Sequence, residues 1–174
     1  MKTLVIHPKD LTTDFLLSVY EGKDWTVISD PYVSSSVLKE AIEAHDRIVM
    51  LGHGAEFGLI ALTSEHNYRT VIGSSLVYLL REKDCVCIWC HADKFVTKYE
   101  LKGFYSGMII SEVKEALMYN VECKAEDVRE SNLLFARTIK ESICEADMLG
   151  VAKSIYVGDH NPIINYNKSN LYGR

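Results

Sequence analysis

The sequence predicts an α/β protein, a three-layer α/β/α sandwich with a mostly parallel central sheet of about six strands. Short apolar runs alternate with amphipathic segments of helical period along the chain, which is typical of parallel strands joined by helices. The runs at 47–51 and 85–89 are apolar almost throughout, as in central strands buried on both faces. The 174 residues contain no repeat or linker-like segment, so residues 1–174 are expected to form one domain.

The expected elements are bounded by residues that end strands or cap helices. Pro8 and Pro31 close the first two strands, and serine or threonine side chains offer helix N-caps. The expected strands are 3–7, 25–29, 47–51, 85–89, 104–110 and 154–157, with a hairpin arm over 57–62. The expected helices begin at Thr12 or Thr13, within 34–36, at Ser74 or Ser75, at Ser111 and at Ala125, the last running to Ala146. The stretch from 91 to 103 is predicted to be a polar loop.

The amino-acid composition indicates which binding partners and which cellular compartment to expect. The net charge is −5 and no stretch concentrates Lys and Arg, so nucleic acid is not an expected partner, because phosphate binding needs a basic face. No apolar run approaches the roughly 20 residues of a membrane span, so a membrane is not expected either. Five cysteines, three of them in one short stretch, make a poor disulfide framework and suit the reduced thiols of a cytoplasmic protein. Nothing in the pattern indicates an oligomeric state.

Two residues with potentially catalytic side chains follow the two most apolar strands. His53 comes directly after the run that ends at Leu51 and Gly52, and Cys90 comes directly after Trp89. Because catalytic groups in open α/β sheets gather at the carboxyl ends of the strands, neighbouring strands would bring the imidazole and the thiol to one edge of the sheet. The sequence therefore predicts a His–Cys site there.

This pair suits nucleophilic catalysis. A thiolate is the attacking species, and an imidazole nearby accepts the thiol proton and later protonates a leaving amine. Gly54 lets its backbone approach a substrate closely, so the N–H groups of Gly54 and Cys90 are the expected donors to an oxyanion.

The segments that carry these residues resemble the caspase, legumain and metacaspase superfamily of cysteine peptidases. They read IVMLGHG over 48–54 and VCIWCHA over 86–92. The resemblance implies a caspase-like fold in which His53 is the general base and Cys90 the nucleophile. It further implies an endopeptidase that cleaves peptide or protein substrates through an acyl-enzyme and needs no cofactor. The run at 103–108 is similar to the segment after the Cys strand in caspase-like relatives, which makes Ser106, together with Asp93, a candidate for the substrate pocket.

The chain also departs from that superfamily. Metacaspases continue after the Cys with His-Ser-Gly, and only His91 matches. Ile88 stands where several relatives carry an aspartate that binds a basic substrate side chain. The stretch 91–103 is too short for an excised linker, so the chain is expected to work uncut. A catalytically inactive caspase-like binding or regulatory domain is therefore the second hypothesis.

Metal and nucleotide sites are less well supported. Cys87 and Cys90 form a Cys-x-x-Cys pattern, but Ile88 and Trp89 between them are strand residues, so the two sulfurs should diverge. The other cysteines and histidines lack metal-ligand spacing, and no metal is expected. The Gly52–Gly54 segment lacks the spacing of a P-loop or a dinucleotide fingerprint.

Overall fold

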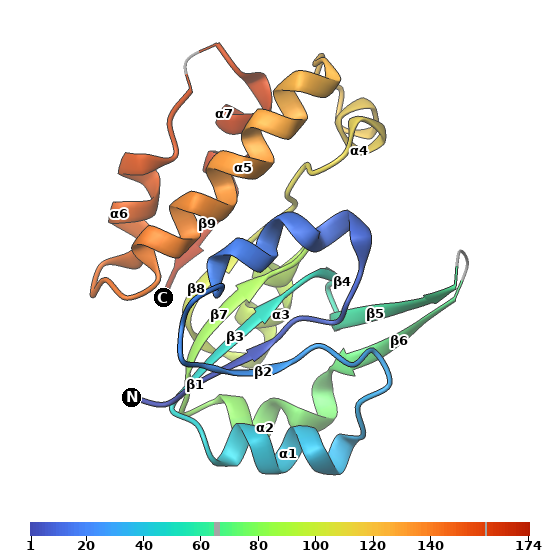
Figure 1. Ribbon diagram of the computed structural model, residues 1–174, viewed down its shortest axis with the longest axis vertical. Helices are drawn as coiled ribbons and strands as arrows, with labels where there is room; N and C mark the ends of the chain where they lie inside the picture. Colours follow the sequence, from blue (N-terminus) through green and yellow to red (C-terminus); the bar gives the residue numbers. More distant parts are fainter. Residues whose placement is uncertain (65–66, 159) are drawn as a thin grey trace.

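The structure is a computed structural model that describes residues 1–64, 67–158 and 160–174. Within these residues six strands form a central sheet in the order β2-β1-β3-β7-β8-β9 (Figure 1). All neighbouring strands are parallel except β8 and β9, which are antiparallel. The strands are β1 (Thr3–Ile6), β2 (Thr26–Ile28), β3 (Arg47–Leu51), β7 (Asp84–Ile88), β8 (Lys102–Ser106) and β9 (Leu171–Gly173). The predicted α/β class with a mostly parallel sheet is confirmed.

Helical segments cover both faces of the sheet. One apolar cluster joins the sheet to α1, α2 and α3, and a second joins its opposite face to η1, α5 and α6; Figure 1 shows α1 and α2 on one side, with α5 on the other. The segments are η1 (Leu11–Val19, a 3-10 helix), α1 (Ser35–Glu43), η2 (Ser74–Leu76), α2 (Val77–Leu80), α3 (Ala92–Tyr99), α4 (Val113–Met118), α5 (Ala125–Ser142), α6 (Met148–Ile155) and α7 (Pro162–Ser169). The three predicted layers are therefore present.

Strands β3 and β7 lie side by side at the centre of the sheet. Their register runs from Arg47 opposite Asp84 to Leu51 opposite Ile88. Their side chains alternate between the two clusters, because successive residues of a strand point to opposite faces. From Ile48 and Cys85 onward the paired residues are at most 3% exposed. The two strands are thus parallel neighbours buried on both faces, as their apolar sequences predict.

A second, smaller sheet leaves the carboxyl end of β3. It consists of β4 (His53–Ala55), β5 (Gly58–Ser64) and β6 (Asn67–Ile72), paired antiparallel in that order. Figure 1 shows β5 and β6 projecting beyond the central sheet. The hairpin arm expected over 57–62 is confirmed, and it is longer than the sequence indicated.

The predicted loop over 91–103 is wrong, because most of it is helix α3. Ala92, Phe95 and Val96 are at most 1% exposed, so the segment has a buried apolar face at helical spacing. Left-handed residues bound it on both sides, His91 at φ 66° and Glu100 at φ 57°. Neither is a glycine, which is the residue expected at such positions.

The strand predicted at 154–157 is also wrong. Residues up to Ile155 complete α6, and Tyr156 is fully buried with its ring 5.5 Å from that of Phe135. The apolar residues in this segment pack on α5 rather than on a neighbouring strand. The edge of the sheet is occupied instead by β9, in the tail for which no element was predicted. Helix α5 ends at Ser142, short of the predicted Ala146.

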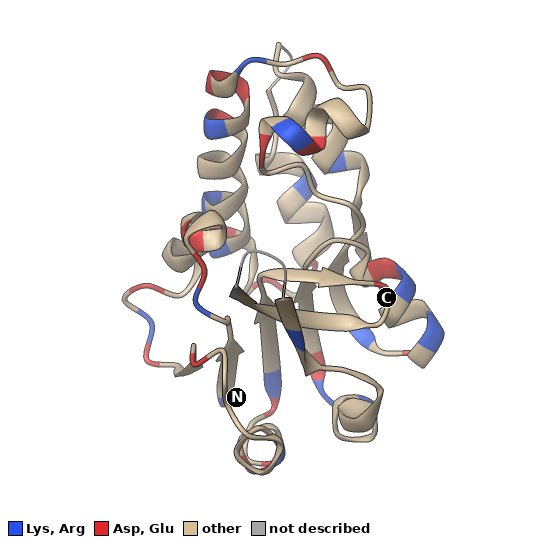
Figure 2. Cartoon of the chain, turned by 90° about the vertical axis from the view of Figure 1, so that its right-hand side faces the viewer, with Lys and Arg blue, Asp and Glu red and all other residues tan. Residues whose placement is uncertain are grey.

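Charges of both signs are interspersed on the outer surface. Figure 2 shows Lys and Arg interleaved with Asp and Glu along the helices, and Arg137 pairs with Glu141 on α5. Among the residues that the structure describes, no helix combines the length and the apolar character needed to cross a membrane.

Candidate functional site

His53 and Cys90 occupy equivalent positions beyond two paired strands. Leu51 and Ile88 are partners at the ends of β3 and β7, and the Gly52 N–H donates to the Ile88 carbonyl at 3.1 Å. His53 and Cys90 each lie two residues beyond that pair. Leu51 and Ile88 face the α5 side of the sheet, and the cavity that His53 and Cys90 line lies on this side, next to Phe135 of α5.

A small cavity on that side has both residues in its wall. Its volume is about 30 Å³, and its lining also includes Phe15 of η1, Glu115 of α4 and Phe135 of α5. This volume holds only a few water molecules. His53 and Cys90 therefore line the same cavity, which is too small to hold a peptide in this structure.

The Cys90 thiol is largely enclosed. Its Sγ donates to the carbonyl of Ile109, which lies between β8 and α4, at 3.8 Å. Burial raises the pKa of Cys90 to about 11, and the nearby Glu115 carboxylate adds to the shift. The thiol is consequently protonated at neutral pH in this arrangement, and attack on a carbonyl would require its proton to be removed.

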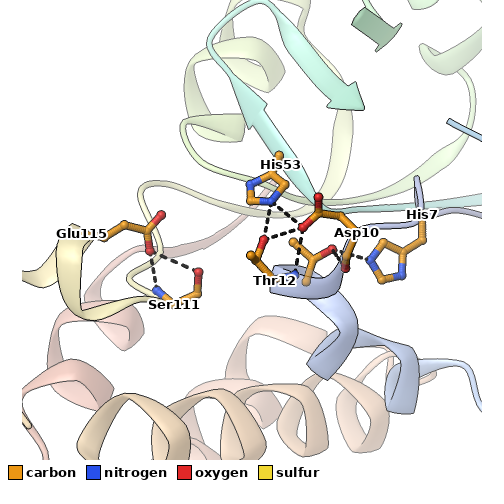
Figure 3. A network of polar contacts seen from close by, with 7 residues as sticks. His7, Asp10, Thr12, His53, Ser111 and Glu115 are labelled. Atoms are coloured by element: carbon orange, nitrogen blue, oxygen red, sulfur yellow. Dashed lines mark hydrogen bonds and ion pairs between the residues drawn. The ribbon is translucent and has the colours of Figure 1, made fainter. Parts of the chain in front are cut away.

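His53 is held from behind by two residues of the η1 segment (Figure 3). Its Nε2 lies 2.7 Å from Thr12 Oγ1 and 3.2 Å from Asp10 Oδ1. The His53 and Asp10 side chains are 28% and 19% exposed, so the contact is partly shielded from solvent. A base with a carboxylate behind it is the arrangement that orients an imidazole in nucleophilic catalysis.

The position of Asp10 follows from its role as the N-cap of η1. Its Oδ1 accepts from the Thr12 N–H at 2.9 Å and from the Thr12 hydroxyl at 2.5 Å. Partial burial works to raise the pKa of Asp10, but the hydrogen bonds from Thr12 and His53 outweigh it and lower the pKa below its ordinary value. The carboxylate is therefore ionised at neutral pH.

His7 fixes the η1 segment against the end of β1. Its Nδ1 lies 3.0 Å from the Tyr20 hydroxyl and its Nε2 lies 3.1 Å from Thr13 Oγ1. The residue is 2% exposed, and burial lowers its pKa to about 4. His7 is thus a neutral, buried support for the segment that carries Asp10 and Thr12.

Gly54 is needed for packing as well as for backbone access. A Cβ at this position would lie 2.0 Å from Cδ1 of Trp89, whose Nε1 donates to the Ala55 carbonyl at 3.1 Å. Ala55 and Gly58 flank a two-residue turn and form the hydrogen-bonded pair, so Gly54, opposite Leu59, belongs to a non-hydrogen-bonded pair. The Gly54 N–H therefore points away from β5. The Cys90 N–H, the other expected oxyanion donor, lies in the turn between β7 and α3.

The two residues expected in a substrate pocket lie elsewhere. Ser106 is fully buried and donates to the Trp89 carbonyl at 3.1 Å, which leaves its hydroxyl inaccessible to a substrate in this structure. Asp93 lies in the first turn of α3, and its Oδ1 is buried without a hydrogen-bond partner in the described part of the chain. Neither residue lines the cavity shared by His53 and Cys90.

The remaining thiols do not form a metal site with Cys90. Cys87 packs in the cluster on the α1 side of the sheet, whereas Cys90 faces Phe135 on the α5 side. The predicted divergence of the two sulfurs is confirmed. Across residues 1–64, 67–158 and 160–174, no group of three or more His, Cys, Asp and Glu side chains is arranged to hold a metal ion.

Another hollow lies at the opposite edge of the sheet. It measures about 610 Å³ and is lined at the amino ends of β3, β7 and β8 by residues of both charges, among them Arg47 and Asp84. These two form an ion pair with each other. The hollow is open, and its lining carries charges of both signs.

Neither the protein-family models nor the curated proteins compared with this chain give a match. A function must therefore be inferred from the geometry of the site. Asp10 and Thr12 were not among the site residues expected from sequence. The Asp-Leu-Thr run is recognisable as a helix N-cap, but no spacing rule connects it to a histidine 43 residues later.

Proposed function

We propose that this chain is a caspase-like cysteine hydrolase that cleaves a peptide bond through an acyl-enzyme formed on Cys90. The observation that carries the proposal is the shared cavity of His53 and Cys90 at the ends of two paired parallel strands. Asp10 behind the imidazole adds to it, because an oriented base is what a thiol with a raised pKa needs.

The proposed reaction uses only groups of this chain, the substrate and water. His53 takes the proton from Cys90, and the thiolate attacks the peptide carbonyl carbon. The oxyanion that forms is held by the backbone N–H groups of Gly54 and Cys90. Collapse of this intermediate breaks the C–N bond, and the leaving amine takes the proton from His53. Water, deprotonated by His53, then hydrolyses the thioester and restores the thiol.

Access to Cys90 requires a local rearrangement. The thiol is covered by the segment around Ile109, and a cavity of about 30 Å³ does not accept a peptide. Substrate binding would therefore displace the segment between β8 and α4, which has no regular secondary structure over residues 107–112.

A second candidate function is a non-catalytic caspase-like module that binds a regulatory partner. The high pKa of Cys90 and the small cavity favour it. Turnover of a positional-scanning peptide library separates the two functions. Hydrolysis by the wild-type chain that is absent in both Cys90→Ala and His53→Ala supports the hydrolase. No turnover by folded wild-type protein supports the module, and equal turnover in all three proteins contradicts the roles proposed for Cys90 and His53.

A further inference from the structure

The contacts between Asp10, Thr12 and His53 determine which of their side-chain oxygen and nitrogen atoms carry a hydrogen. One oxygen, Asp10 Oδ1, faces three groups: the Thr12 N–H at 2.9 Å, the Thr12 hydroxyl at 2.5 Å and His53 Nε2 at 3.2 Å. An ionised carboxylate can only accept hydrogen bonds. Each of the three partners must therefore donate to it.

The Thr12 hydroxyl has a single proton, and the 2.5 Å contact with the Asp10 carboxylate uses it. The hydroxyl oxygen can then only accept from His53 Nε2, which lies 2.7 Å away. Both neighbours of Nε2 are consequently acceptors. A bare nitrogen lone pair there would face an oxygen lone pair and a carboxylate, so Nε2 must carry a hydrogen.

We infer that Asp10, acting together with Thr12, is a positioning residue that holds uncharged His53 as its Nε2–H tautomer and leaves Nδ1 as the nitrogen that accepts a proton. As a statement about catalysis, this rests on the proposed function, because it makes Nδ1 the atom that takes the Cys90 proton. As a statement about His53, it stands on the hydrogen-bond geometry around the ionised Asp10 carboxylate. Asp10 acts through His53 and does not itself touch the substrate.

The tautomer is measured directly by two-bond ¹H–¹⁵N correlation spectra of the imidazole rings at neutral pH, with the His53 signals assigned from His53→Gln. The wild-type chain is expected to show the Nε2–H pattern at His53. A predominant Nδ1–H pattern in the wild type overturns the inference, and this result does not depend on any variant folding.

Two substitutions test whether Asp10 is the cause. Asp10→Ala releases the Thr12 hydroxyl to donate to Nε2, so the Nδ1–H population of His53 is expected to rise. Asp10→Asn keeps an acceptor oxygen at the Oδ1 position and is expected to retain the wild-type tautomer. Asp30→Ala is the matched control, because Asp30 accepts from the Tyr32 N–H in the same way, whereas Nε2 of His53 contacts Asp10 and Thr12. An unchanged tautomer in folded Asp10→Ala, or the same change in Asp30→Ala, contradicts the inference.

The rate at which a peptide electrophile labels Cys90 separates this inference from the proposed function. With both correct, labelling falls on the order of tenfold or more in Asp10→Ala and is largely restored in Asp10→Asn. The Nε2–H tautomer in a wild-type chain that is not labelled leaves the positioning role intact and removes the hydrolase. Labelling of a wild-type chain that shows the Nδ1–H tautomer supports the hydrolase and removes the positioning role of Asp10.

Discussion

His53 and Cys90 each follow a strand-paired residue at the same distance, His53 two residues after Leu51 and Cys90 two residues after Ile88. The register of β3 against β7 therefore brings the strand ends that precede His53 and Cys90 to the same edge of the sheet. Both residues line one cavity with Phe135 of α5, on the face of the sheet to which Leu51 and Ile88 point. The positions of His53 and Cys90 thus depend on the pairing of β3 with β7 and on the turns that follow these strands.

The three cysteines of the β7 region should respond differently to truncation. Cys85 and Cys87 are at most 1% exposed in the core, so Cys85→Ala and Cys87→Ala are expected to lower the free energy of unfolding by on the order of 1 kcal/mol. Both should retain peptide-electrophile labelling of Cys90, and Cys90→Ala should abolish it. Chemical denaturation and mass spectrometry make the comparison. Equal loss of labelling in all three folded variants would indicate a shared metal or redox site.

Alkylation of Cys90 by a small electrophile should depend steeply on pH. With the Cys90 pKa raised to about 11 by burial and by Glu115, the rate should rise about tenfold per pH unit above neutrality, since only the thiolate reacts. The exposed Cys144 serves as an internal reference for the reagent. Mass spectrometry of the labelled peptides at each pH measures both rates. A Cys90 rate that levels off near neutral pH would show that the thiolate is already formed.

His7 should make the fold sensitive to acid. Its pKa falls from 6.5 in the unfolded chain to about 4 in the fold because of burial. The unfolded state therefore binds the proton first, and stability is lost as the pH drops from 6.5 towards 4. The full effect is on the order of 3 kcal/mol for this buried group. Urea titrations across this range should show the loss in the wild type and a flatter profile in His7→Gln. Identical profiles would mean that other groups control acid unfolding.

Asn167 of α7 holds the segment that covers Cys90 through hydrogen bonds to Ile110. Its Oδ1 accepts from the Ile110 N–H at 2.8 Å and its Nδ2 donates to the Ile110 carbonyl at 2.9 Å. Asn167→Ala leaves both backbone groups without these partners and should lower the free energy of unfolding by about 1–3 kcal/mol. Because Ile110 is next to Ile109, the segment over Cys90 should also open more often, and labelling of Cys90 should be faster. Hydrogen exchange at Ile110 reports the loosening. Asn165 is exposed on the same helix, so Asn165→Ala is the control. Equal rates of Cys90 labelling in the two variants would show that Asn167 does not control access to Cys90.

Hydrophobic patterning was sufficient to predict strands β1, β2, β3, β7 and β8 of the central sheet and to place His53 and Cys90 after two of them. The apolar runs ending at Leu51 and Ile88 are typical of central strands in a parallel sheet, and His53 and Cys90 each come two residues later. The patterning did not predict α3, whose ends are left-handed residues that are not glycine, or β9, whose three residues are held by pairing with β8. Such features depend on tertiary contacts rather than on local preference. Asp10 was missed for the same reason, since only the packing of η1 brings it to His53.

Labelling of wild-type protein and His53→Ala with a peptide acyloxymethyl ketone, followed by peptide mapping, is the decisive test of His53 as the base that activates Cys90. This reagent requires both a bound peptide and an activated thiol, whereas a small alkylating agent at high pH requires only an accessible thiolate and serves as the control for access to Cys90. We expect the ketone to modify Cys90 in the wild type and to fail with His53→Ala, while the small reagent labels both at similar rates. Modification of Cys90 by the ketone at equal rates in the two proteins would contradict the assignment of His53 as the base.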